Sequence, residues 1–152
     1  MAKEIERKFL VRSREFESEA VSRLDIRQAY LSTAADATVR LRVSGEQAWL
    51  TVKSRNHGCE RGEWEYPVAV SDALEMIAAT GCRCIHKYRY IVPAGHGLVW
   101  EVDEFVNPAN GLVVAEIELP SADTPFEIPL WLGAEVTGDT RYYNSEIVKS
   151  LS

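Results

Sequence analysis

The chain lacks the features of secreted, disulfide-bonded or membrane-spanning proteins. It has only three cysteines, and Cys82 and Cys84 are separated by one residue rather than the two typical of zinc or redox pairs. An odd number of cysteines without such spacing predicts free thiols in a reducing compartment. No apolar run approaches the roughly 18 residues of a membrane span, and the N-terminus shows no signal-peptide pattern. We therefore expect a cytoplasmic protein with no membrane contact.

An excess of basic charge is also absent. The 17 Lys and Arg residues are outnumbered by 23 Asp and Glu residues, which gives a net charge of −6. Because non-specific nucleic-acid binding needs a basic surface, no nucleic-acid partner is expected. The three histidines are scattered, and no glycine-rich loop is followed by Lys-Ser or Lys-Thr, so no P-loop is present. Any anionic ligand must be held by cations that cluster locally.

The pattern of apolar residues predicts one mainly β domain that spans residues 1–152. Alternation of apolar and polar residues predicts strands over 4–11, 26–31, 38–43, 48–53, 63–66, 85–92, 98–105 and 112–119. Helical spacing predicts a short helix or turn over 13–24, a helix over 71–79 and a terminal helix over 144–151.

Details of these helices also follow from the sequence. Ser71 suits the N-cap of the second helix, Leu74, Ile77 and Ala78 its buried stripe, and Gly81 its end. The proline-rich stretch 121–132 excludes a long regular helix, and 138–143 suggests a turn or a short strand.

Six of the predicted strands carry two like charges at alternate positions. Alternation in a strand puts both members of a pair on one face, with an apolar or aromatic residue between them on the other. The pairs are Glu4/Glu6, Arg40/Arg42, Glu63/Glu65, Lys87/Arg89, Glu101/Asp103 and Glu116/Glu118. An ordinary half-exposed sheet would mix signs along each strand to avoid repulsion. The sorted charges indicate a face with a special environment.

The charged faces must lie either on one open surface or inside a closed barrel, because the apolar faces need cover. About eight antiparallel strands can close around one small ligand. Charges inside a barrel are costly unless they are paired, hydrated or bound to ions. A water-filled tunnel that holds a polyanion and divalent cations meets this need, because basic groups bind phosphate and carboxylates bind metal. We therefore expect an α+β, mainly β fold: an eight-stranded antiparallel closed barrel with a few flanking helices.

The segment Glu4-Ile5-Glu6-Arg7-Lys8 resembles the Glu-x-Glu-x-Lys signature of the CYTH superfamily, the triphosphate tunnel metalloenzymes. The later charged pairs follow in that family's order, and short bacterial inorganic triphosphatases are the most similar members. The resemblance implies one or two Mg²⁺ or Mn²⁺ ions. Their implied ligands are Glu4, Glu6, Glu116 and Glu118, with Asp103 as a further ligand. It implies phosphate binding by Lys8, Arg40, Arg42, Lys53, Lys87, Arg89 and Arg141. It implies catalytic roles for Tyr30, Lys53, Glu63 and Glu65.

The resemblance also implies an activity: metal-dependent hydrolysis of inorganic tripolyphosphate to pyrophosphate and phosphate. Thiamine triphosphatase and class IV adenylate cyclase activities are alternatives within the same fold, although no residues stand out as an adenine site. A non-catalytic polyphosphate- or nucleotide-binding module is an alternative of another class. The many acids argue against such a module, because anion binding alone does not need them. The protein is expected to be a monomer or a homodimer.

Overall fold

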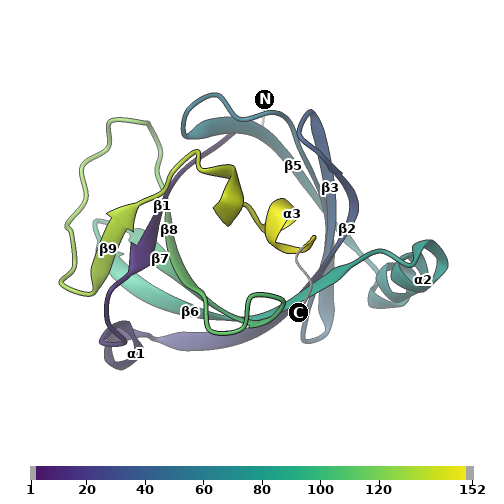
Figure 1. The fold of residues 1–152 in the computed structure, drawn as a ribbon, viewed down its shortest axis with the longest axis horizontal. Helices are drawn as coiled ribbons and strands as arrows, with labels where there is room; N and C mark the ends of the chain where they lie inside the picture. Colours follow the sequence, from purple (N-terminus) through teal and green to yellow (C-terminus); the bar gives the residue numbers. More distant parts are fainter. Residues whose placement is uncertain (1–2, 150–152) are drawn as a thin grey trace.

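The computed structural model describes residues 3–149, and its main feature is a closed barrel of eight antiparallel strands (Figure 1). The order around the barrel is β5-β4-β3-β2-β6-β7-β8-β1, and β1 pairs back onto β5. The strands are β1 (Lys3–Val11), β2 (Ser22–Ala34), β3 (Ala37–Ser44), β4 (Gln47–Lys53), β5 (Glu60–Val68), β6 (Cys84–Gly95), β7 (Leu98–Asn107) and β8 (Val113–Glu118). The predicted fold class is confirmed.

Strand β1 closes the barrel because it pairs with both β5 and β8. Its first residues pair with β5, where Glu4 lies opposite Arg61, and Glu6 to Leu10 pair with β8. Beyond β5 the second edge of β1 is taken by a short strand that the sequence analysis missed, β9 (Leu132–Glu135). At Gly133 an added Cβ would lie 2.9 Å from the carbonyl oxygen of Leu10, so glycine allows this close approach. Four residues carry too little alternation to reveal a strand that forms only because an edge is open.

The first helix is much shorter than the prediction over 13–24. Helix α1 (Phe16–Glu19) has one turn, and β2 already begins at Ser22, where it pairs with Ile91 of β6. Residues 22–25 are therefore strand, because ladder pairing with a long neighbour outweighs the weak helical spacing. Phe16 is the buried residue of α1 and is fully enclosed.

Helix α2 (Val70–Thr80) ends as predicted but begins and packs differently. Gly81 ends it in a left-handed conformation with φ 61°, and its N–H donates to the carbonyl of Ile77. The N-cap is Ala69, not Ser71. The side facing the barrel carries Ala73, while Leu74, predicted to be buried, is 55% exposed. Ala78 is exposed too, so the predicted stripe was rotated by about one residue.

The C-terminal segment enters the barrel instead of covering it. A 3₁₀ turn, η1 (Thr140–Tyr142), leads into α3 (Asn144–Ile147), which lies within the ring of strands (Figure 1). The helix begins at Asn144, as predicted, with Tyr143 as its N-cap, and its predicted end at Leu151 falls outside the described residues. Ile147 and Val148 pack among inward-facing apolar residues, namely Tyr30, Ile85, Phe105 and Val114. This apolar cluster fills part of the lumen and bounds the polar space beside it.

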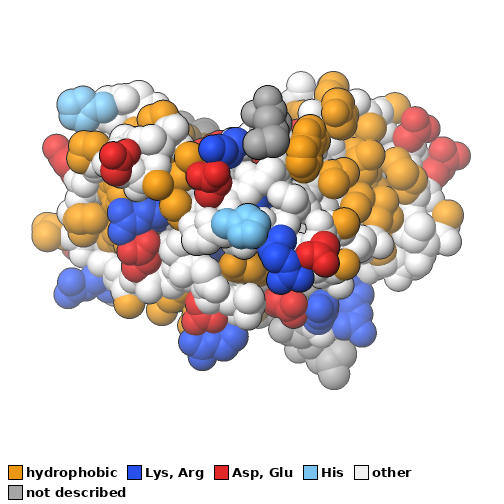
Figure 2. Space-filling model, turned by 90° about the horizontal axis from the view of Figure 1, so that it is seen from above, with side chains coloured by type: hydrophobic (Ala, Val, Ile, Leu, Met, Phe, Trp, Pro, Cys, Tyr) orange, Lys and Arg blue, Asp and Glu red, His pale blue; other side chains and the backbone are white. Residues whose placement is uncertain are grey.

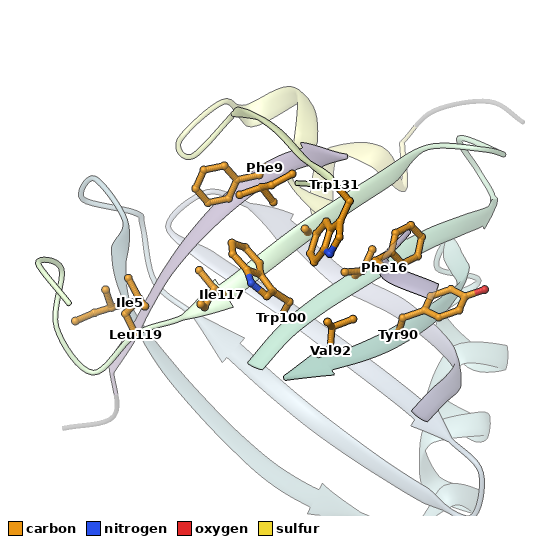
Figure 3. Close-up of a cluster of buried hydrophobic side chains, with 12 residues drawn as sticks. Ile5, Phe9, Phe16, Tyr90, Val92, Trp100, Ile117, Leu119 and Trp131 are labelled. Atoms are coloured by element: carbon orange, nitrogen blue, oxygen red, sulfur yellow. The ribbon is translucent and has the colours of Figure 1, made fainter. Parts of the chain in front are cut away.

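The main hydrophobic core lies outside the barrel wall (Figure 3). It is covered by α1 and by the proline-rich stretch, which contains no helix or strand between 120 and 131. Trp100 of β7 packs edge-to-face against Trp131 and Phe9, with ring centroids 5.6 Å apart in both pairs. Both tryptophans therefore cover the barrel wall from outside.

One face of the outer surface lacks the charge sorting seen along the strands. On the face in Figure 2, acidic and basic side chains are interspersed. No helix in residues 3–149 is long and apolar enough to cross a membrane.

Candidate active site

The barrel encloses a polar cavity of about 210 Å³ to which all eight strands contribute side chains. Of the predicted site residues, it is lined by Glu4, Glu6, Lys8, Tyr30, Arg40, Arg42, Lys53, Glu63, Glu65, Lys87, Arg89, Glu116 and Glu118. The strand alternation therefore identified which face of each strand turns inward. The cavity is smaller than the roughly 300–1,000 Å³ typical of sites for drug-sized ligands, which favours a compact ligand.

The order of the strands sorts the charges into two walls. Strands β7, β8, β1 and β5 are neighbours and bring together an acidic wall, in which Glu6 lies opposite Glu118 and Glu101 opposite Glu116. Strands β4, β3, β2 and β6 are neighbours on the other side and carry the basic wall. Its cations are Lys53, Arg40, Arg42, Lys87 and Arg89. Two cations stand among the acids instead, Lys8 on β1 and Arg61 on β5.

Two carboxylates of the acidic wall are neutralised by cations. Burial alone would raise the pKa of Glu4, but Lys53 and Arg61 outweigh it and lower the pKa to about 2. The Lys53 Nζ lies 3.0 and 3.1 Å from the two carboxylate oxygens of Glu4. Burial likewise opposes the ionisation of Glu116, yet Lys8, with Nζ 3.4 Å away, helps to hold its pKa well below the usual range.

Glu6 and Glu118 of the same wall have no such partner. Within residues 3–149 no ion pair reaches either carboxylate. Burial and the neighbouring Glu116 and Glu4 raise the pKa of Glu6 well above its normal value. Partial desolvation together with Glu4 and Glu63 raises the pKa of Glu118 to about 7. The acidic wall thus has more carboxyl groups than its own cations can hold in the ionised form.

The basic wall has the opposite imbalance. Burial, then repulsion from Arg40 and Arg89, lowers the pKa of Arg42 to about 9. Burial lowers the pKa of Lys87 to about 7, although Asp103 partly offsets the effect. The Nε of Arg40 is buried and has no hydrogen-bond partner in the described part of the chain. Such a donor costs free energy unless a ligand satisfies it, so this wall is suited to an anion.

Asp103 of β7 lies opposite Arg89 of β6 in the strand ladder and does not line the cavity. Its carboxylate is 2.7 Å from the Nζ of Lys87 and accepts hydrogen bonds of 2.8 and 2.9 Å from the guanidinium of Arg89. The predicted role of Asp103 as a metal ligand does not agree with this position. In this conformation Asp103 pairs with two cations, and the structure does not bring it together with the other predicted metal ligands.

Arg141 is the second predicted residue that the structure places elsewhere. It lies on η1 outside the cavity, its side chain is 79% exposed, and it pairs with Asp139 at 2.7 Å. In this conformation Arg141 is not brought together with the other predicted phosphate-binding residues. Arg61, which the sequence analysis overlooked, lines the cavity instead and donates to Glu4 at 3.3 Å. Arg61 is two residues from Glu63 on β5, so strand alternation could have predicted that it also faces the cavity.

The four residues expected to act in catalysis do not form one connected group, because they contact different partners. Lys53 lies 3.4 Å from Glu63, and Glu65 accepts a hydrogen bond of 2.8 Å from the hydroxyl of Thr51. The hydroxyl of Tyr30 accepts from the amide of Gln28 at 3.2 Å. Among residues 3–149 no hydrogen bond joins Tyr30 to Lys53.

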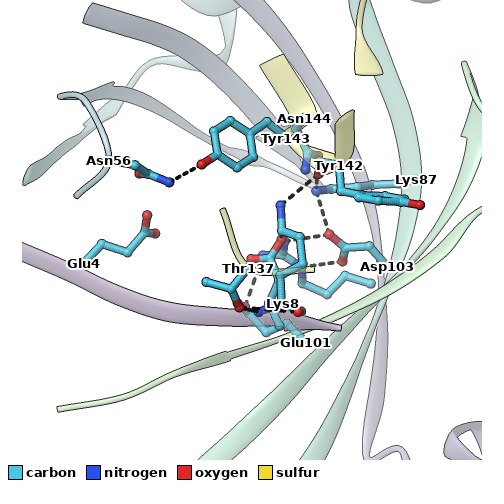
Figure 4. Close-up of polar contacts among 12 residues, drawn as sticks. Glu4, Lys8, Asn56, Lys87, Glu101, Asp103, Thr137, Tyr142, Tyr143 and Asn144 are labelled. Carbon is cyan, nitrogen blue, oxygen red and sulfur yellow. Dashed lines mark hydrogen bonds and ion pairs between the residues drawn. The ribbon is translucent and has the colours of Figure 1, made fainter. Parts of the chain in front are cut away.

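The C-terminal segment completes the cavity with residues that carry no charge (Figure 4). Lys8 donates from Nζ to the carbonyl of Tyr142 at 2.9 Å, and Lys87 donates to Oδ1 of Asn144 at 2.8 Å. The amide of Asn56 donates to the hydroxyl of Tyr143 at 2.6 Å. Nothing in the local pattern of 142–144 distinguishes these residues from an ordinary helix start.

The carboxylates of the acidic wall have the chemistry that a divalent metal requires. Mg²⁺ and Mn²⁺ prefer oxygen ligands, and Glu6 and Glu118 are the carboxylates that lack a cation. In this conformation no three His, Cys, Asp or Glu side chains between residues 3 and 149 form a metal-binding group. Glu4 and Glu116 lie against lysines instead. The donor set fits a divalent cation, provided that these side chains turn from their lysines to reach it.

Comparisons with known proteins agree with the architecture of the site. The CYTH domain family matches residues 2–148. The chain is 44% identical to a protein of Acetivibrio thermocellus named inorganic triphosphatase, over 99% of this chain and 96% of the relative. It is 36% identical to a protein of the same name from Nitrosomonas europaea, over 97% of this chain and 98% of the relative. A crystal structure of an inorganic triphosphatase superposes with a TM-score of 0.68 at 33% identity, covering 97% of this chain and 98% of that one. The chain belongs to the CYTH domain family.

Proposed function

We propose that the protein hydrolyses inorganic tripolyphosphate to pyrophosphate and phosphate with the help of Mg²⁺ or Mn²⁺. The observation that carries the proposal is the complementary imbalance of the two walls. One wall holds cations that repel each other, and the other holds carboxylates that lack a cation. A polyanion bound together with a divalent metal satisfies both at once. Two relatives that match nearly the whole chain carry the name inorganic triphosphatase.

The basic wall would bind the phosphate chain. Arg40, Arg42 and Arg89 can each present a planar set of donors to phosphate oxygens, while Lys8 and Lys87 act as point charges. Because these groups already stand in position, they can stabilise charge that develops on the oxygens during the reaction without reorganising. The Nε of Arg40, which has no partner among the described residues, is a hydrogen-bond donor available to a phosphate oxygen.

The acidic wall would hold the metal. Glu4, Glu6, Glu116 and Glu118 are the ligand candidates, and Asp103 is not among them because it is taken up by Lys87 and Arg89. A bound divalent cation would supply Lewis-acid polarisation of phosphoryl oxygens.

Hydrolysis needs a water molecule in line with the bond to be broken. Glu63 is a suitable proton acceptor for that water, because burial and the neighbouring Glu4 raise its pKa. The water oxygen would bond to the terminal phosphorus while the bond to the pyrophosphate oxygen breaks. Lys53, 3.4 Å from Glu63, would orient its carboxylate, and Glu65 would orient Arg40, 3.4 Å away.

The free cysteines suit a reducing compartment, and we place the protein in the cytoplasm on that ground.

The proposal is tested by phosphate release from tripolyphosphate, pyrophosphate, ATP and thiamine triphosphate, each with Mg²⁺, Mn²⁺ or a chelator. The highest kcat/KM is expected for tripolyphosphate, and chelation should abolish turnover. Turnover without metal, or a preference for ATP or thiamine triphosphate, would contradict the proposal. Formation of cyclic AMP from ATP would identify a cyclase, and binding of every triphosphate without turnover would identify a non-catalytic module.

A further inference from the structure

Two neutral amide side chains connect the cations of the basic wall to the C-terminal segment. Gln28 of β2 is 1% exposed, and its Oε1 accepts a hydrogen bond of 3.1 Å from Nε of Arg42. Its Nε2 donates to Oδ1 of Asn144 at 2.9 Å. The same Oδ1 accepts from Nζ of Lys87 at 2.8 Å (Figure 4). Arg42, Gln28, Asn144 and Lys87 thus form one continuous chain of hydrogen bonds.

The orientation of both amides follows from their partners. Arginine and lysine have only donors, so each must face an amide oxygen. Gln28 therefore turns its oxygen to Arg42, which leaves its NH₂ group to face Asn144. Asn144 receives donors from both Gln28 and Lys87 on its oxygen, so its orientation is determined too.

Neutral acceptors serve a phosphate-binding wall better than carboxylates would. Lys87 and Arg89 already share Asp103, whereas no carboxylate among residues 3–149 pairs with Arg42. A carboxylate in place of either amide would neutralise cations that the ligand needs. An amide oxygen accepts the hydrogen bond, holds the cation in place and leaves its charge available.

The segment that brings Asn144 to this place is anchored separately. Ile147 and Val148 are 4% and 3% exposed within the apolar cluster of the lumen. Asn144 itself lines the cavity, although it starts a helix of only four residues. The apolar contacts of α3 thus hold the segment, while Asn144 reaches into the polar network.

We propose that Asn144, acting with Gln28, is a positioning residue that aims Lys87 and Arg42 at the phosphate chain without adding a further carboxylate beside them. The proposal rests on the proposed function for the identity of the ligand. A merely structural role at the start of α3 makes a different prediction, because an acidic residue in the first turn of a helix is stabilising.

The test compares Asn144→Asp and Asn144→Ala with wild type, using Asn110→Asp as a control that adds the same charge at an exposed turn. The readouts are kcat and KM for tripolyphosphate with Mg²⁺ and the melting temperature. In Asn144→Ala we expect KM to rise about tenfold with a smaller change in kcat, because mainly binding is lost. In Asn144→Asp we expect kcat/KM to fall about a hundredfold although the protein melts no lower than Asn144→Ala, because the new carboxylate pairs with Lys87. Asn110→Asp should match wild type.

Wild-type KM in Asn144→Asp would overturn the proposal. A double variant with Gln28→Leu adds a second check: the losses of Gln28→Leu and Asn144→Ala should combine to less than their sum, because both break one chain. Additive losses would show that the two amides act separately. If the wild-type protein fails to turn over tripolyphosphate, the proposed function is wrong. The same variants are then compared by the melting shift that tripolyphosphate induces. Loss of that shift in Asn144→Asp alone would still support the positioning role, and an equal shift in all variants would exclude it.

Discussion

Replacing Asp103 by asparagine tests whether this residue anchors two cations or binds metal, because the two roles predict opposite changes in the stability of the metal-free protein. In the structure Asp103 is a fully enclosed anchor that holds Lys87 and Arg89, with 2% of its surface exposed. Asp103→Asn keeps the shape but leaves both cations without that partner. A metal ligand would behave in the opposite way, because removing one of several repelling carboxylates leaves the metal-free protein as stable as before or more stable.

The expected size of the effect comes from the burial of the network. Breaking a buried ion pair by removing one partner costs about 3–5 kcal/mol, because a charge is left uncompensated. Two features favour the lower value. Arg89 keeps Glu101 at 3.1 Å, and Lys87, with a pKa of about 7, can lose its proton when Asp103 is gone. We expect a loss of about 3 kcal/mol, which lowers the melting temperature of a domain of this size by roughly 6–12 °C.

The pH dependence gives a further check. Lys87 has a folded pKa of about 7, below the ordinary lysine pKa of 10.5, so the unfolded chain binds more protons between these values. The stability of the wild-type protein should gain from this group as the pH rises from 7. The ion pair with Asp103 is complete below that pH and weakens as Lys87 loses its proton. The stability deficit of Asp103→Asn should therefore be larger at pH 6 than at pH 9.

The assay is thermal unfolding in chelator at pH 6 and pH 9 for wild type, Asp103→Asn and Glu104→Gln. Glu104 is the matched control, because it neighbours Asp103 on β7 but points outward to Arg14 at 3.2 Å, with 27% of its side chain exposed. A partly exposed pair of this kind should cost less than about 1 kcal/mol. An unchanged or higher melting temperature in Asp103→Asn would refute the anchor role and return Asp103 to the metal ligands.

Three further changes test other parts of the structure. Glu6→Gln removes a charge that its neighbours repel, so the chelated protein should melt at the same or a higher temperature. The stabilisation by Mg²⁺ with tripolyphosphate and the turnover should both be lost, and a retained shift would place the metal elsewhere. Arg42→Lys keeps the charge but loses the planar donors, so kcat/KM should fall at least tenfold, about 1.4 kcal/mol, whereas Arg27→Lys on the outer face should match wild type. Trp100→Ala opens a cavity in the outer core and should lower the free energy of unfolding by about 3–5 kcal/mol in urea titration, and a loss under 1 kcal/mol would contradict its packing.

The strands were predictable because alternation is a local property. A side chain on the wrong face of a half-buried strand is costly, so the pattern of two identifies both the strand and its inward residues. The pairs Glu4/Glu6 and Arg40/Arg42 revealed in this way which faces line the lumen. The strands that were not predicted are those whose formation depends on pairing with a segment distant in the sequence. Residues 22–25 became strand through β6, and β9 formed on an open edge of β1.

The same distinction between local pattern and distant pairing applies to the functional site. The sequence determined which charges turn inward, but only the closed barrel decided which of them meet. Asp103 shares the inward face with Glu101, yet it lies deeper and is used up by two cations. Asn144 gave no local signal, because its role depends on partners more than 50 residues away in the sequence. Alternation specifies a face within one strand. The position along the barrel and the partner across the lumen depend on strand order and register, which only the tertiary structure establishes.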